Sequence, residues 1–128
     1  MRKQYHLRES PRGLLAWDID RLIDLSRSRP VQKIALSDIR EFDEPFWFNQ
    51  EDLRPTVRDV AEHAKLIRDC DLQYPIILDH TGRVMDGMHR VAKAWLEGAE
   101  TVNAVRFTFP LEPDHVGVAA KDLSYDRD

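Results

Sequence analysis

The sequence Asp86-Gly87-Met88-His89-Arg90 lies where the hydrophobic pattern changes from that of strands to that of a helix. Before it, apolar runs at 76–78 and 84–85 are separated by turn residues, which is typical of two short strands. After it, apolar residues recur at helical spacing until Gly98, a suitable helix C-cap. The sequence therefore predicts a strand, a turn, a second strand, a tight glycine turn and a helix.

This glycine turn brings an acid, a histidine and an arginine to the beginning of a helix. The first backbone N–H groups of a helix have no intrahelical partner and carry a partial positive charge. His89 and Arg90 fall in the first helical turn, where they can add side-chain donors to those N–H groups. The pattern is typical of an anion or phosphate site, although it does not name a reaction.

Each residue of the turn has a binding role and a structural alternative. Asp86 can hold Mg²⁺, orient Arg90 or cap the helix, and capping is the commonest single role of an aspartate there. Arg90 can bind a phosphate or pair with a surface acid, while His89 can contact a phosphate, transfer a proton or only pack. Gly87 is best explained by backbone geometry, and Lys93 either reaches a phosphate from the next turn or is simply exposed. The candidate ligand-binding residues are Asp86, Gly87, Met88, His89, Arg90 and Lys93.

An acidic group and an aromatic group follow a predicted strand at 31–36. Besides His89, the candidate catalytic residues are Glu41, Asp43 and Glu44, because a phosphoryl transferase uses a carboxylate to accept the proton of the substrate hydroxyl. The alternative is a solvated acidic loop. Residues 46–48, Phe-Trp-Phe, either wall a pocket and stack on a base or pack into the core.

The remaining pattern divides the chain into an N-terminal helical extension at 1–30, a domain at 31–109 and an acidic tail at 110–128. Ser10-Pro11 is a helix-start signal, and the tail is expected to be poorly ordered. The other expected elements are a helix over 11–28, a strand over 31–36, a helix over 56–70 and a strand over 102–109.

Composition excludes several classes of protein. The 128 residues carry a formal net charge of −4, without the basic excess of a DNA-binding domain. Cys70 is the only cysteine, which excludes an internal disulfide, and His63 and His80 are isolated in sequence and suggest no metal site. There is no apolar run of about 20 residues to span a bilayer and no secretory signal, so we expect a cytoplasmic protein with no membrane partner.

Residues 31–109 resemble the ParB/sulfiredoxin-like fold family, in which a hydrophobic strand precedes a glycine turn and an arginine-containing helix follows. The likeness is closest between Gly87 and Gly98. It implies a compact, single-domain α/β fold with a small mixed sheet and packed helices. It also implies a nucleotide-phosphate site at the Gly87 turn, with ATP, ADP or CTP as the nucleotide and Mg²⁺ on Asp86.

Branches of this family differ at the turn. Sulfiredoxins carry Gly-Gly-Cys-His-Arg, and here Met88 stands at the position of their nucleophilic cysteine. Partition proteins carry Gly-Glu-Arg-Arg, of which Gly87 and Arg90 match the first and last positions. Free-serine kinases carry Asp-Gly-x-His-Arg, which is similar to Asp86, Gly87, His89 and Arg90 and favours phosphoryl transfer.

Two classes of function therefore stay open. The first is a nucleotide-phosphate-binding domain with phosphotransfer or nucleotide hydrolysis activity, whose partner is a nucleotide or a phosphorylated small molecule. The second is a non-catalytic module of a partition, plasmid or phage system that binds a protein or nucleic-acid partner. Nucleic acid is not expected to bind the isolated domain, and a homodimer is compatible with the sequence.

Overall fold

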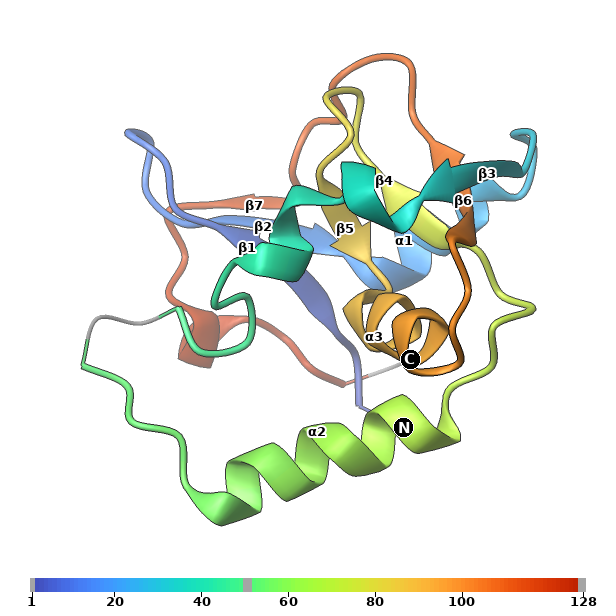
Figure 1. The fold of residues 1–128 in the computed structure, drawn as a ribbon. Coiled ribbons are helices and arrows are strands. Elements are labelled where there is room, and N and C mark those ends of the chain that lie inside the picture. Colours follow the sequence, from blue (N-terminus) through green and yellow to red (C-terminus); the bar gives the residue numbers. More distant parts are fainter. Residues whose placement is uncertain (1, 50–51, 127–128) are drawn as a thin grey trace.

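The strand, turn and helix segment around Gly87 lies at the centre of the computed structural model, which describes residues 2–49 and 52–126 (Figure 1). Its two strands are antiparallel and belong to a four-stranded mixed sheet, in which the strand at 76–78 runs parallel to the strand at 101–106. The helix α3 (Met88–Leu96) begins directly after the glycine turn, as predicted. In sheet order the strands are β3 (Gln32–Ala35), β6 (Thr101–Arg106), β4 (Ile76–Leu78) and β5 (Val84–Asp86).

Strand β4 is buried on both faces, and alternate residues serve two different cores. Ile76 and Leu78 pack with Val91 of α3, whereas Ile77 packs on the opposite face with Leu22 and other residues of the N-terminal part. The continuous apolar run at 76–78 reflects this double burial.

The N-terminal part differs from the expected helix over 11–28. Two strands, β1 (Tyr5–Arg8) and β2 (Leu15–Asp18), pair antiparallel before α1 (Ile19–Ser26) begins. The helix prediction is therefore wrong for the segment before Ile19, because Asp18 is the N-cap and its carboxylate accepts a hydrogen bond from the Asp20 N–H.

The C-terminal tail, expected to be poorly ordered, packs onto this N-terminal part. Strand β7 (His115–Val116) pairs with β2 and completes a three-stranded antiparallel sheet. The Asp114 carboxylate accepts a hydrogen bond from the Asp18 N–H at 2.8 Å, and Leu123 is buried. The tail is thus part of the fold, and the strand expected over 102–109 ends at Arg106.

Helix α2 (Val57–Asp69) lies at the edge of the molecule, beneath α3 in the view of Figure 1. Thr56 and Asp59 form a capping box at its start. Unlike α1 and α3, α2 contains no buried residue. Among the described residues no helix has the length and apolar character needed to cross a membrane.

Candidate functional site

The glycine turn between β5 and α3 requires a glycine at position 87. Gly87 is the N-cap of α3 with φ of 112°, a region that side chains other than glycine rarely adopt. A Cβ atom there would lie 2.6 Å from Cγ2 of Ile76 and 2.9 Å from its Cβ. The close approach of β4 to the turn therefore fixes both the conformation of residue 87 and its lack of a side chain.

Asp86 orients Arg90 and does not cap the helix, so the expected capping role is wrong. No side chain caps α3, and the Asp86 carboxylate instead accepts a hydrogen bond from Arg90 Nη2 at 2.8 Å. Arg90 Nη1 donates to the carbonyl oxygens of Tyr74 and Pro75, each at 3.0 Å. Arg90 is thus bound to the loop that precedes β4, and its side chain is only 15% exposed.

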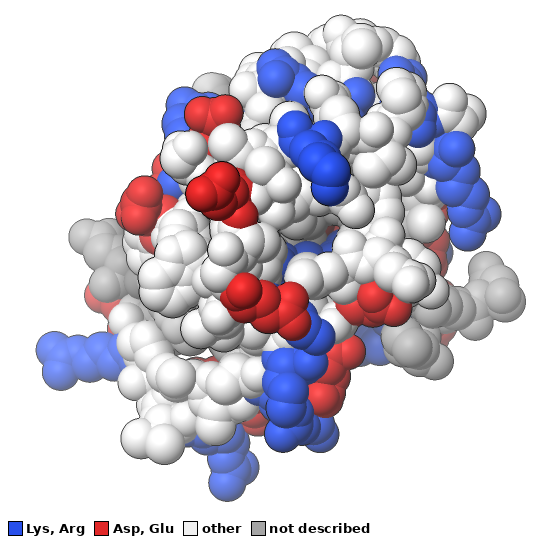
Figure 2. Space-filling model, turned by 45° about the vertical axis from the view of Figure 1, so that its right-hand side comes forward, with Lys and Arg blue, Asp and Glu red and all other residues white. Residues whose placement is uncertain are grey.

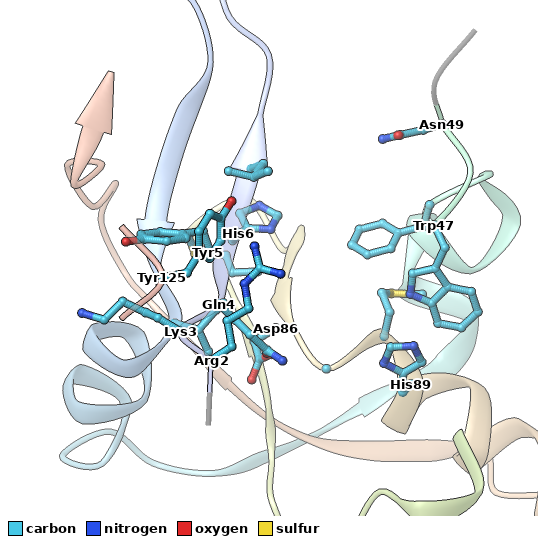
Figure 3. A pocket seen from close by; sticks show the side chains of 16 residues that line it. Arg2, Lys3, Gln4, Tyr5, His6, Trp47, Asn49, Asp86, His89 and Tyr125 are labelled. Carbon is cyan, nitrogen blue, oxygen red and sulfur yellow. The ribbon is translucent and has the colours of Figure 1, made fainter. Parts of the chain in front are cut away.

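A cavity of about 760 Å³, called here the motif cavity, opens beside the glycine turn (Figure 3). Figure 3 shows side chains of the N-terminal segment and Tyr125 on one side and Trp47, Asn49 and His89 on the other. Of the six predicted ligand-binding residues, Asp86, Gly87, Met88 and His89 line this cavity, whereas Arg90 and Lys93 do not. The other lining residues are Arg2, Lys3, Gln4, Tyr5, His6, Leu7, Ile19, Phe46, Trp47, Asn49, Met85 and Tyr125.

The N-terminal segment provides the cationic wall of the motif cavity. The guanidinium of Arg2 lies 4.1 Å from the centre of the Tyr125 ring, a cation–π distance. Lys3 donates to the Asp18 carboxylate at 3.0 Å, and this hydrogen bond raises the pKa of Lys3. Arg2 forms no ion pair with a described acid, so it is the cation with charge available to an anion in the cavity.

Opposite this wall, His89, His63 and Trp47 form an aromatic cluster. Nε2 of His89 lies 2.8 Å from Nδ1 of His63, within hydrogen-bond distance. The Trp47 ring stacks on both imidazoles, with centroid distances of 4.4 Å to His63 and 4.6 Å to His89. His63, which the sequence presented as isolated, therefore connects α2 to His89 in the first turn of α3.

His89 is neutral at physiological pH. Burial lowers its pKa to about 4, and the neighbouring His63 and Arg90 act in the same direction. Its neutral imidazole can donate one hydrogen bond and accept another. His6, on the opposite wall, is similar, because burial and the adjacent Arg8 lower its pKa to about 3.

The predicted catalytic acids lie outside the motif cavity. Glu41 is 2% exposed, and its Oε2 accepts a 2.6 Å hydrogen bond from the Val84 N–H and contacts Arg83. Glu44 forms a bidentate pair with the same arginine, which lowers the pKa of Glu44. Asp43 is exposed on the surface. Glu41 and Glu44 line an adjacent cavity instead. Because Glu41 is buried, the alternative prediction of a solvated acidic loop does not hold for this residue.

Lys93 binds the end of α2. Its ammonium donates to the carbonyl oxygens of Arg68 at 2.9 Å and Cys70 at 2.6 Å. A cation at this position satisfies carbonyl groups that a helix C-terminus leaves unpaired and interacts favourably with the helix dipole. Lys93 is therefore not simply exposed, as one of the sequence interpretations had it, because its hydrogen bonds link α3 to α2.

Residues 46–48 combine pocket lining with packing against the core, and stacking on a base stays a prediction. Phe46 and Trp47 line the motif cavity and also pack against the core beneath α3. Phe48 contacts His63 edge to face at a centroid distance of 5.3 Å. The segment thus walls a pocket while remaining anchored to the core.

Sequence reasoning missed the contribution of the chain ends to the cavity. Arg2, Lys3 and Tyr125 lie far from Gly87 in sequence, and pairing of β1 with β2 and of β2 with β7 brings both ends to the turn. The basic composition of residues 1–6 was the available signal in the sequence.

The surface gives no sign of a nucleic-acid interface on the face drawn in Figure 2. Lys and Arg side chains over the upper part of this face are separated by uncharged residues, Asp and Glu side chains lie at its left and lower parts, and neither kind forms a continuous field. Within the described ranges, no three His, Cys, Asp or Glu side chains gather as a metal-ligand group. A metal ion at Asp86 would therefore need ligands from water or from a bound molecule.

Comparison with known proteins adds no evidence about the family or the function of this chain. No protein-family model matches the chain, and searches of curated proteins and of solved structures found no significant match.

Proposed function

We propose that the chain is a ParB/sulfiredoxin-like domain and that it binds a nucleoside phosphate in the motif cavity, with the phosphates at the beginning of α3. The observation that carries the proposal is the convergence of three features on one cavity. These are a glycine-capped helix N-terminus, an arginine that forms no ion pair with a described acid and an aromatic wall. Each suits a different part of a nucleotide.

The phosphate end of the ligand would lie between the glycine turn and Arg2. The unpaired N–H groups at the start of α3 offer hydrogen-bond donors. Asp86 supplies a carboxylate in the same wall, and Mg²⁺ commonly binds through one or two carboxylates together with water and phosphate oxygens. The residues present therefore fit a Mg²⁺–nucleotide complex, in which Mg²⁺ would reduce the negative charge on the phosphates.

The base would pack against the aromatic residues of the opposite wall. Phe46 and Trp47 provide ring surface in the cavity, and stacking on such rings accepts any base. This surface explains why ATP, ADP and CTP all belong in the first binding experiment.

Transfer or hydrolysis of a terminal phosphoryl group is the activity that we propose for this complex. Catalysis of this kind depends chiefly on positioning and on electrostatic stabilisation. With a pKa of about 4, His89 is unprotonated near neutral pH and can accept a hydrogen bond from an attacking hydroxyl or water. The acids at 41, 43 and 44 do not line the cavity, so the proposal assigns them no catalytic step.

Calorimetric titration of the full chain with ATP, ADP and CTP, with and without Mg²⁺, tests the proposal. We expect saturable binding that weakens about tenfold or more in Arg2→Ala, because a charge-assisted contact is lost. Arg12→Ala is the matched control, since Arg12 is an exposed arginine outside the cavity. Arg90→Ala is less suitable, because it also removes three hydrogen bonds that hold the turn. Absence of binding to any nucleotide would overturn the proposal.

A non-catalytic partner-binding module is the second candidate, and the surface of α2 is the observation that favours it. Val57 is 88% exposed and Val60 55% exposed on this helix. Exposed apolar side chains grouped on one helix are common at protein interfaces. A nucleotide that binds without phosphate release or transfer to any acceptor would favour this second candidate.

A further inference from the structure

We propose that a second cavity, on the far side of the Asp86–Arg90 pair, binds a small apolar molecule that carries one carboxylate. This cavity has a volume of about 520 Å³ and shares only Asp86 with the motif cavity. It lies between α1, the segment that follows it and the loop before β4. The inference does not depend on nucleotide binding.

The walls of the second cavity are mostly apolar. The volume falls within the range of small-molecule pockets, which combine apolar walls with a few polar groups that orient the ligand. Burial of a hydrocarbon group against such walls is favourable in proportion to the apolar area removed from water. The apolar walls are formed by Ile23, Val31, Tyr74, Pro75, Ile77 and Val105.

Arg29 places a guanidinium beside these walls, and this guanidinium forms no ion pair with a described acid. Its Nε is buried and has no hydrogen-bond partner among the described residues. Its other contacts are a long 3.5 Å hydrogen bond to Thr108 and cation–π contacts with Phe107 and Phe109, each at 5.1 Å. A carboxylate in the cavity would accept hydrogen bonds from the terminal Nη groups of Arg29, of which only one N–H donates to Thr108.

Arg90 provides a second source of donors in the same cavity. It uses Nη1 twice and Nη2 once in hydrogen bonds to the protein, and a guanidinium has five N–H groups. Two N–H groups therefore remain for a ligand. A third arginine of the lining, Arg27, is already paired with Asp24 at 2.7 Å and is 73% exposed.

The balance of apolar walls and few donors selects the class of ligand. A phosphate group requires many donors and is strongly hydrated, whereas a single carboxylate is satisfied by one or two arginine contacts. Asp71, at the exposed rim, accepts a hydrogen bond from the Gln73 N–H and disfavours a ligand with several negative charges. A monocarboxylate with a hydrocarbon or aromatic group fits these conditions.

Two-dimensional amide NMR titrations of the full chain with octanoate and 4-phenylbutanoate, below their aggregation concentrations, test this proposal. We expect saturable shifts confined to residues around the second cavity. The corresponding uncharged amides, octanamide and 4-phenylbutanamide, should bind about tenfold or more weakly, because the charged hydrogen bonds are missing.

Variants separate the cavity from nonspecific binding. Arg29→Met keeps most of the side-chain bulk and should weaken octanoate binding about tenfold, whereas Arg12→Met, at an exposed arginine outside the second cavity, should leave it unchanged. Val31→Trp, at a position that is 57% exposed, should block the cavity without disturbing the core. Equal binding of acid and amide, shifts elsewhere on the molecule or identical behaviour of the two arginine variants would each overturn the proposal.

Discussion

Helices α2 and α3 have similar apolar sequence patterns but very different surroundings in the structure. Both are amphipathic in sequence and both were predicted from apolar spacing. Val91 of α3 is completely buried, whereas Val57 of α2 is 88% exposed. Helical periodicity therefore identifies a helix without telling how much of its apolar side will be covered.

The difference arises from what lies against each helix. Helix α3 packs against the mixed sheet through Met88, Val91 and Ala94. Helix α2 is held instead by the His63–His89 contact, by stacking of Trp47 and by the hydrogen bonds of Lys93. We therefore expect α3 to share the global stability of the domain and α2 to open locally at a lower free energy.

The largest effect should come from the turn that attaches α3 to the sheet. Gly87→Ala places a Cβ 2.6 Å from Ile76 in a left-handed conformation, and we expect a loss of about 3 kcal/mol of unfolding free energy. Chemical denaturation measures this loss. Gly98→Ala at the other end of α3 has a similar φ of 78° but open space around the Cβ, so it should cost only about 1 kcal/mol. Equal losses would show that close packing at Gly87 contributes nothing.

A matched pair of valine truncations compares the two helices directly. Val91→Ala should lower the unfolding free energy by about 2–3 kcal/mol, since it removes buried methyl groups and leaves a cavity. Val57→Ala should change it by less than about 0.5 kcal/mol, because that side chain is exposed. A large loss in Val57→Ala would mean that the outer side of α2 is covered in solution, which denaturation at several protein concentrations would detect.

The sequence was sufficient to predict the part of the fold that depends on local rules. The change from strand to helix periodicity at Gly87 appears in the structure as expected, and the helix predicted over 56–70 is present as α2. Ser10-Pro11 misled the prediction because the same residues also begin a turn. The Ser10 carbonyl accepts a hydrogen bond from the Gly13 N–H, and its hydroxyl donates to the Gly13 carbonyl.

The candidate site was less predictable because it depends on contacts between distant segments. Strand β1 pairs with β2 and β7 pairs with β2, and only these pairings bring Arg2 and Tyr125 to the glycine turn. No local pattern specifies strand partners over such separations, and β7 is only two residues long. The orientation of the Arg90 side chain could not be predicted for the same reason, since its partners include the carbonyl oxygens of the loop before β4.

Acidification should destabilise α2 more than α3. The folded-state pKa of His89 is about 4, below the ordinary value of 6.5, so the unfolded chain binds more protons between these values. Stability contributed by neutral His89 is therefore present above about pH 6.5 and is lost as the pH falls toward 4. His6, with a folded-state pKa of about 3, adds a global loss in the same direction.

Because His89 contacts His63 of α2, amide protection factors in α2 should decline more steeply over this range than those in α3. Hydrogen exchange by NMR, corrected for intrinsic rates, measures both helices at once. His63→Gln/His89→Gln is the control and should remove the difference in pH dependence. If the protection factors of α2 and α3 declined in parallel in the unmodified chain, the His63–His89 contact would not be what holds α2 locally.

The smallest expected effect concerns the end of α2. Lys93→Met removes two hydrogen bonds to carbonyl oxygens of residues 68 and 70, and we expect a local loss of about 1 kcal/mol. This loss corresponds to about fivefold faster exchange in the last turn of α2, with little change in α3. Lys65→Met provides the control, since Lys65 is an exposed lysine of the same helix. If exchange accelerated equally in both helices, the contact would support the whole domain, and α2 would be as firmly attached as α3 despite its exposed apolar side.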